Sequence, residues 1–214
     1  MGRGRENRWK GVALTVTLTA ISPALQQASG VYDTPEWKKE IAAGKVPYRK
    51  VTLDDYPVRD NEHPDTGMYT EGFLVVEYEA AWSERTRPAK AWVTSWTVRS
   101  GLNRTKSSRR SWFKDTTGML PHEQGHLDIN EIYAKAMIKR GKSDLPTGVG
   151  FRGVDALKDL DRKLEPIVNA ILNANTAEQA KYDQETEGGM NPDKQKEWAK
   201  SIQERMQRAG IVRP

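Results

Sequence analysis

Residues 120–134 read LPHEQGHLDINEIYA, and the pentad His122-Glu123-Gln124-Gly125-His126 decides how the rest of the chain is interpreted. It has the form H-E-x-x-H. Because residues four apart lie on one face of a helix, both imidazoles can reach the same metal ion. Glu123 can reach a water molecule at that ion without binding the ion itself. This spacing is typical of zinc hydrolases in which the glutamate is the general base.

The scarcity of metal-binding residue types sharpens this interpretation. The chain has no cysteine and three histidines among 214 residues, so a metal ion has to be held by His, Asp and Glu. A disulfide scaffold, a thiolate zinc finger and a cysteine nucleophile are thereby excluded. The alternative, two solvated histidines on an amphipathic helix, is weaker because two of the three histidines fall in the pentad.

A catalytic zinc ion needs a third protein ligand and one open position. The extended metzincin motif requires Gly and His at positions 129 and 132, and both are isoleucine here, which excludes that class. His63 is the other histidine. Carboxylates are the remaining candidates, and Asp128 and Glu131 also suit the role of orienting the histidines. The carboxylate candidates are Asp183 and Glu185, followed by Asp128, Glu131 and Glu165.

Helical periodicity predicts four helices. One covers about 120–140 and ends at Gly141, with basic residues in its last turn. A second covers about 154–187 with an apolar stripe, and Pro166 inside it should kink or split it. Shorter helices are expected at 34–44 and 193–208.

Alternating apolar and polar residues predict an antiparallel hairpin. Its strands follow Phe73 to Trp82 and Trp92 to Val98, joined by a turn that contains Pro88. We expect Trp92 and Trp96 to share one tryptophan-rich face that needs a cover. Residues 46–56 suggest a further strand, and residues 58–68 a loop.

The amino-terminal region predicts export. A basic start, an apolar run over 12–21 and small residues up to Gly30 match a secretory signal peptide over residues 1–28, although a plain strand also fits. Residues 1–24 hold four of the 34 basic and one of the 29 acidic residues, so their removal lowers the net charge from +5 to +2. This weakens the case for a nucleic-acid partner. The basic segment 99–114 is interpreted mainly as a solvated connection between sheet and helix.

Several ordered pieces of the chain resemble a bacterial domain-of-unknown-function family of predicted secreted HExxH zinc-dependent proteases. The pieces are Val51-Thr-Leu-Asp-Asp-Tyr56, the two strands, Ser111-Trp112, residues 120–134, Tyr182-Asp-Gln-Glu-Thr186, Gln195 and Trp198. Gly188 departs from the family, which usually has histidine there; if that histidine binds metal or steadies the transition state, activity here is impaired. With glycine in that place, Asp183 is assigned as the third ligand, with Glu185 second.

The expected fold is therefore α+β and zincin-like: a small antiparallel β-sheet packs on the HExxH helix, and the second long helix closes the metal site. The expected domains are a signal peptide (1–28), a helix or linker (29–45), the zincin-like domain (46–208) and a tail (209–214). The expected function is periplasmic or secreted, zinc-dependent hydrolysis of peptide or protein substrates, without nucleic acid or stable membrane insertion. Zn²⁺ is held by His122, His126 and Asp183, Glu123 is the general base, and Tyr182 or Tyr133 stabilises the oxyanion. The rival is a degenerate, non-enzymatic binding protein that uses the Trp-rich sheet or residues 99–114.

Overall fold

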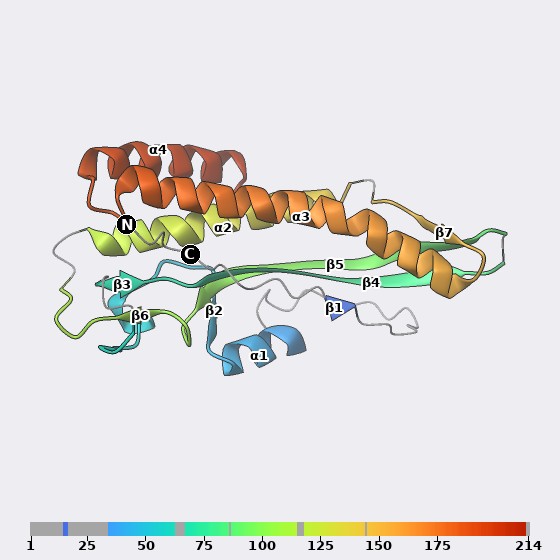
Figure 1. Ribbon diagram of the computed structural model, residues 1–214, viewed down its shortest axis with the longest axis horizontal. Coiled ribbons are helices and arrows are strands. Elements are labelled where there is room, and N and C mark those ends of the chain that lie inside the picture. Colours follow the sequence, from blue (N-terminus) through green and yellow to red (C-terminus); the bar gives the residue numbers. More distant parts are fainter. Residues whose placement is uncertain are drawn as a thin grey trace, which may run out of the picture.

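The computed structural model describes residues 15–16, 34–62, 67–85, 87–114, 118–143 and 145–212. Within these ranges the chain forms the predicted α+β fold, with helices lying against mostly antiparallel sheets (Figure 1). The helices are α1 (Pro35–Ala42), η1 (Leu53–Asp55, a 3-10 turn), α2 (Met119–Gly141), α3 (Gly153–Thr186) and α4 (Pro192–Arg208). The strands are β1 (Thr15–Val16), β2 (Lys45–Pro47), β3 (Met68–Tyr69), β4 (Gly72–Ser83), β5 (Ala89–Asn103), β6 (Ser108–Arg109) and β7 (Gly148–Gly150).

The long β4–β5 hairpin is the base of the fold and confirms the predicted strand pair. Its antiparallel register runs from Gly72 opposite Leu102 to Ser83 opposite Lys90. Strands β2 and β7 join β5 antiparallel, β1 joins β4 parallel, and β3 and β6 form a separate pair. Apart from β1, the proposed signal peptide lies outside the described residues, so it stays a prediction.

A β-bulge shows that the prediction of one face for Trp92 and Trp96 is wrong. Tyr78 pairs with Trp96, whereas Ala80 pairs with Val93, so a step of two residues along β4 matches a step of three along β5. The extra residue reverses the side-chain alternation beyond it. Trp96 consequently packs with the core beneath the helices, and Trp92 is 41% exposed on the other face.

Three helices cover one face of the hairpin. Figure 1 shows α2 and α3 running antiparallel over β4 and β5, α4 stacked on them, and α1 on the opposite side of the sheet. The stripe of α3 that meets the sheet is buried and apolar along most of its length; it comprises Leu160, Leu164, Val168 and Leu172. Among the described residues, no helix has the length and apolar character that a bilayer span requires.

Pro166 does not split the second long helix, so that part of the prediction is wrong. Helix α3 is continuous over 34 residues, and Figure 1 draws it as one bent ribbon. Proline removes one helical hydrogen bond, but Pro166 is exposed and lies on the solvent side, where a bent helix opens. Buried Leu164 and Val168 on either side hold both halves on the same sheet. Glu187 and Gly188 then end the helix with positive φ angles of 52° and 64°.

The predicted strand over residues 46–56 is largely wrong. Only β2 forms a strand there, and η1 follows. The carboxylate of Asp55 accepts the backbone N–H of Thr52 at 2.9 Å and also binds Arg49 at 3.0 Å. Such local side-chain bonds to the backbone compete with a sheet ladder, which explains why the apolar pattern of this stretch misled the prediction.

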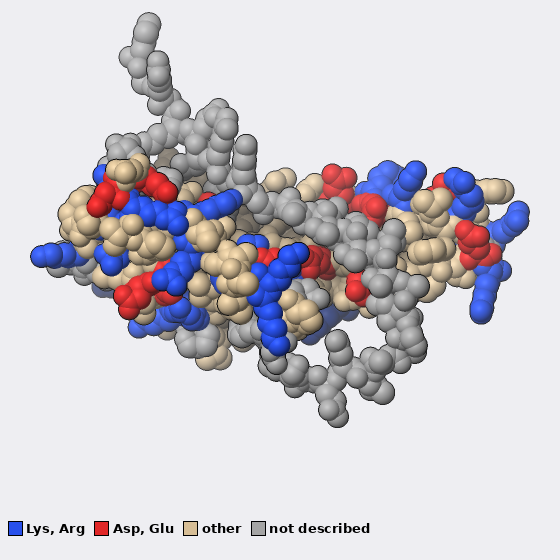
Figure 2. All heavy atoms as spheres, turned by 90° about the horizontal axis from the view of Figure 1, so that it is seen from below, with Lys and Arg blue, Asp and Glu red and all other residues tan. Residues whose placement is uncertain are grey.

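The basic segment 99–114 makes ion pairs and hydrogen bonds with other segments, so it is more than a solvated connection between sheet and helix. Its first residues complete β5, where buried Arg99 pairs with Glu77 at 2.6 Å. Arg104 and Arg109 donate to backbone carbonyl groups of residues 54 and 53 at 3.0 and 3.3 Å. On the face shown in Figure 2, acidic side chains are interspersed with the basic ones.

Candidate metal centre

Helix α2 begins so that the whole pentad lies in its first two turns. Gly118 adopts a left-handed conformation as the N-cap residue, and Pro121 falls in the first turn, where its missing N–H costs no helical hydrogen bond. His122 and His126 are 2% and 8% exposed. Because buried polar groups require partners, the groups that contact these two imidazoles determine the chemistry available at this end of the helix.

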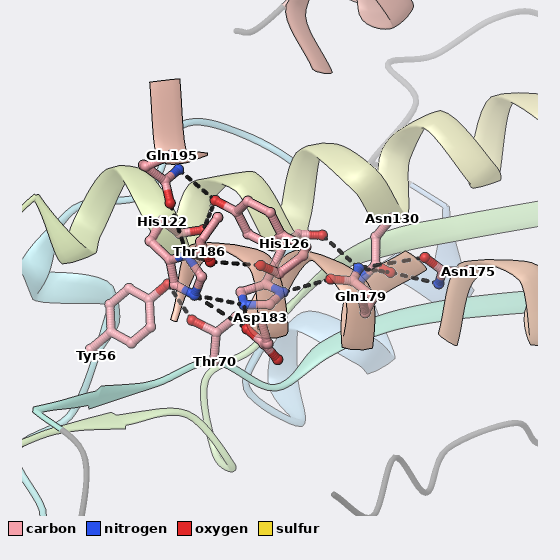
Figure 3. A network of polar contacts seen from close by, with 11 residues as sticks. Tyr56, Thr70, His122, His126, Asn130, Asn175, Gln179, Asp183, Thr186 and Gln195 are labelled. Atoms are coloured by element: carbon pink, nitrogen blue, oxygen red, sulfur yellow. Dashed lines mark hydrogen bonds and ion pairs between the residues drawn. The ribbon is translucent and has the colours of Figure 1, made fainter. Parts of the chain in front are cut away.

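Both histidines and Asp183 converge on one point. Nε2 of His122 lies 3.2 Å from Nε2 of His126, and Oδ1 of Asp183 lies 3.3 and 2.9 Å from these two nitrogen atoms. Asp183 comes from the last turn of α3, which runs antiparallel to α2 and ends beside its start (Figures 1 and 3). Its side chain is 37% exposed, so solvent reaches the cluster from this side.

The separations of these three atoms fit a four-coordinate cation. Ligands about 2.0–2.1 Å from a tetrahedral zinc ion lie roughly 3.3 Å from one another, close to the three separations found here. Within the described ranges this is the group of His, Asp and Glu side chains that can hold an ion together. The donor set of two imidazoles and one carboxylate suits zinc and leaves a fourth position open.

Without a cation, protons hold the same cluster together. Burial lowers the pKa of His126, but the hydrogen bond and charge of Asp183, the charge of Glu123 and the hydrogen bond to Gln179 outweigh it and raise the pKa to about 9. Burial raises the pKa of Asp183, yet hydrogen bonds and charge from both histidines hold it well below its usual range. A metal ion must therefore displace a proton from His126.

The far sides of both rings are held by amides. Nδ1 of His126 lies 2.5 Å from Oε1 of Gln179 on α3, and Nδ1 of His122 lies 3.1 Å from Oε1 of Gln195 on α4. Thr186 lies 3.4 Å from the same atom of His122. Figure 3 shows these amides pointing at the rings from the side away from Asp183.

Tyr182 packs against the rings of both histidines. Its ring stacks on His122 with centroids 4.6 Å apart, and its hydroxyl donates to the His122 carbonyl at 3.1 Å. A Cβ atom at Gly125 would lie 2.3 Å from this hydroxyl, so glycine in the pentad permits the close approach of α2 and α3. Gly189 likewise packs on His122, where an added Cβ would lie 3.0 Å away.

Glu123 is 5% exposed, and its charge acts on neighbouring titratable groups. After burial, its charge is the next cause that raises the pKa of Tyr56. It also contributes to the raised pKa of His126. Tyr56, whose hydroxyl lies 2.9 Å from that of Thr70, appears beside His122 in Figure 3. The charge of Glu123 therefore acts on His126 and Tyr56, although Glu123 does not belong to the cluster of ligand atoms.

Other candidates from the sequence lie elsewhere. Glu185 accepts from Trp198 at 2.8 Å, and the exposed Glu165 is not in the ligand cluster. Asp128 accepts from Tyr48 and Gln124 at 2.8 and 2.9 Å, and Glu131 pairs with Ser100 and Lys135. The groups found at the far nitrogen of each ring are thus amides, where the sequence favoured Asp128 and Glu131. His63 lies outside the described residues.

The expected oxyanion stabilisers are engaged in structural bonds. Tyr133 donates to Glu178 at 2.7 Å, and Tyr182 donates to the His122 carbonyl. Gly188, where the resemblance implied a histidine, has no atom within 4 Å of an added Cβ and therefore borders open space.

Sequence reasoning missed Gln179, although α3 carries a readable signal. The buried stripe that starts as Leu160, Leu164, Val168 and Leu172 continues as Asn175, Gln179 and Tyr182. A change from apolar to amide residues on a buried face, four residues before Asp183, indicates that this end of the helix meets polar partners.

The comparisons with known proteins concern the same region. A family described as "Bacterial protein of unknown function (DUF922)" matches residues 69–189, which span β3 to the end of α3 and include the whole cluster. No curated protein and no solved structure matches the chain.

Proposed function

Because this chain belongs to the DUF922 family of bacterial proteins, whose description assigns no activity, we propose a function from the site itself: zinc-dependent hydrolysis of peptide bonds. The proposed ligands are His122, His126 and Asp183, and the proposed general base is Glu123. The packing of the hairpin beneath α2, with α3 supplying the third ligand, is accordingly proposed to be zincin-like.

The observation that carries this proposal is the triangle of 3.2, 3.3 and 2.9 Å between two imidazole nitrogen atoms and one carboxylate oxygen atom. These three atoms prefer a shared proton or a cation between them. Glu123, buried and adjacent to His122 in the sequence, adds the group that hydrolysis requires and that simple metal storage does not.

Zinc, when bound, supplies a Lewis acid that polarises a carbonyl group and acidifies water. Glu123 takes the proton of the attacking water and returns it to the leaving amine. His122 and His126, fixed by their amide partners, would hold the ion at the first turns of α2. Half-exposed Asp183 borders the side from which a peptide can enter.

The test combines metal content with hydrolysis. Wild-type protein should hold one equivalent of zinc by elemental analysis and cleave members of a broad peptide library. Glu123→Gln should retain the zinc and lose hydrolysis about 10²–10⁴-fold, because an amide cannot accept the proton. Glu165→Gln, a matched change on the exposed face of α3, should alter neither quantity. An active Glu123→Gln variant would contradict the assignment of the base.

A second candidate, a degenerate zincin-like protein that binds partners without catalysis, is favoured by one observation. The family histidine is replaced by Gly188, and the added Cβ there meets open space. Protein that holds zinc yet cleaves nothing in the library would support this candidate. Restored cleavage in Gly188→His would then identify the missing group, and continued inactivity would leave peptide hydrolysis without support.

The proposed site of action is the periplasm or the exterior. The basic, apolar and small residues of 1–28 carry this proposal. Mature protein from the native host should begin after Ala24 or Ala28. Recovery of an intact amino terminus from the cytoplasm would refute it.

A further inference from the structure

Each histidine of the candidate metal centre is linked to its own backbone carbonyl group by a closed ring of hydrogen bonds. We infer that these two rings fix both imidazoles, in their neutral form, in the tautomer that carries its proton on Nδ1, so that both Nε2 lone pairs face Asp183. Gln179 and Gln195 are then positioning residues of the metal centre. The role of the two rings in zinc binding rests on the proposed function, whereas the assignment of the two tautomers does not.

The first ring joins His126 and Gln179. Nε2 of Gln179 donates to the His126 carbonyl at 2.9 Å and to Oδ1 of Asn130 at 3.1 Å. A backbone carbonyl can only accept, so this end of the amide must be the nitrogen. The other end, Oε1, then faces Nδ1 of His126 at 2.5 Å, and Nδ1 must carry the proton.

The second ring passes through a hydroxyl group. Tyr182 donates to the His122 carbonyl at 3.1 Å, so its oxygen atom accepts from Nε2 of Gln195 at 2.7 Å. Oε1 of Gln195 consequently faces Nδ1 of His122 at 3.1 Å. Thr186 agrees with this assignment, because its hydroxyl donates to the Tyr182 carbonyl and offers Nδ1 only a lone pair.

The surroundings of Gln179 show that its orientation is enforced. Gln179 is 1% exposed, and Asn175 donates to Oδ1 of Asn130 at 2.7 Å, which leaves that oxygen atom facing two amide donors. Nδ2 of Asn130 has no hydrogen-bond partner within the described part of the chain. The cluster thus leaves one buried donor unpaired while it presents an acceptor to His126.

Without these rings, the competing tautomer is available. An imidazole protonated on Nε2 would donate to Oδ1 of Asp183, which lies 2.9 Å from His126 and 3.3 Å from His122. In a neutral imidazole that arrangement covers the Nε2 atom that binds the ion, whereas the tautomer protonated on Nδ1 offers its Nε2 lone pair to zinc. Partners at the far nitrogen of a zinc-binding histidine typically change metal affinity 10–100-fold.

The test uses the full chain and two readouts. Long-range ¹H–¹⁵N spectra of metal-free protein, at a pH where both imidazoles are neutral, report which nitrogen carries the proton. Competition with a chromophoric chelator gives the zinc dissociation constant. The variants are Gln179→Leu, Gln179→Glu, Gln195→Leu and Gln195→Glu. The matched control is Gln203→Leu, the same substitution at an exposed glutamine of α4.

We expect each leucine variant to lose the Nδ1 proton of its own histidine and to bind zinc about 10–100-fold more weakly. The glutamate variants still offer an acceptor to Nδ1 and should keep the tautomer, although each places an oxygen atom where the amide donated. Gln203→Leu should match wild type in both readouts. Gln195 is half-exposed, so its variants supply the test if Gln179→Leu fails to fold. Leucine variants that retain both the Nδ1 proton and wild-type affinity would overturn the inference. If wild-type protein binds no zinc, the proposed function fails, and the tautomer spectra alone decide whether the rings act as inferred.

Discussion

Replacing Asp183 by asparagine removes the carboxylate that faces both imidazoles, and it should release a proton from His126 in metal-free protein. The pKa of His126 balances burial, which lowers it, against Asp183, Glu123 and Gln179, which together raise it to about 9 from 6.5. Asparagine keeps the shape of the side chain and an acceptor oxygen, but it removes the charge of Asp183 and weakens the hydrogen bond, which are the two largest raising contributions. We expect the pKa of His126 in the variant to fall to 6.5 or below.

The corresponding change in stability follows from linkage. A pKa raised by about 2.5 units corresponds to about 3 kcal/mol of stabilisation in the metal-free folded state. Because the folded pKa lies above the unfolded value, this stability is fully present below pH 6.5 and is lost as the pH rises through 9. The lowered pKa of Asp183 describes the same ion pair and adds nothing further. Asp183→Asn should therefore be less stable than wild type at pH 6 and nearly equal to it at pH 10.

The assay pairs NMR titration of the imidazoles with urea unfolding of chelator-treated protein at pH 6, 8 and 10. Glu165→Gln is again the matched control, since it removes an exposed α3 carboxylate outside the cluster. A metal-free wild type in which His126 titrates near 6.5 would refute the reasoning. An unchanged pKa in Asp183→Asn would do the same.

Three further predictions concern the ligands and the packing around them. His122→Ala and His126→Ala should each abolish stoichiometric zinc in elemental analysis, whereas His63→Ala should keep it; the reverse pattern would reassign the site. Gly125→Ala places a Cβ 2.3 Å from the Tyr182 hydroxyl and should lower the free energy of unfolding by about 1–3 kcal/mol in urea, against a helix-propensity gain of under about 1 kcal/mol. Leu160→Ala empties a fully buried position and should cost about 2–5 kcal/mol while zinc affinity in the chelator assay stays unchanged.

Local features of this chain were predictable because they depend on neighbours in sequence. The pentad places two histidines on one helix face whatever surrounds it. Helices α2 and α4 begin and end where proline, glycine and basic residues indicate, and the β4–β5 alternation predicts a hairpin. The prediction of Asp183 as a ligand drew on a resemblance, and the structure brings its carboxylate to the histidine pair.

Features that depend on contacts between distant elements could not be predicted. The bulge beside Ala80 turns Trp92 outward, since a single extra residue reverses the face of every residue after it. Packing of Leu164 and Val168 on one sheet keeps α3 continuous through Pro166, against the local preference of proline.

The sequence by itself determined the chemistry of the candidate centre, because the types and spacing of His122, Glu123 and His126 are properties of one helix. Only the tertiary structure decided what surrounds that chemistry. Gln179 and Gln195 lie 53 and 73 residues from the histidines that they contact, on two other helices. No local pattern sets which amide atom faces which ring nitrogen, because that choice follows from the packing of three helices around carbonyl groups that can only accept.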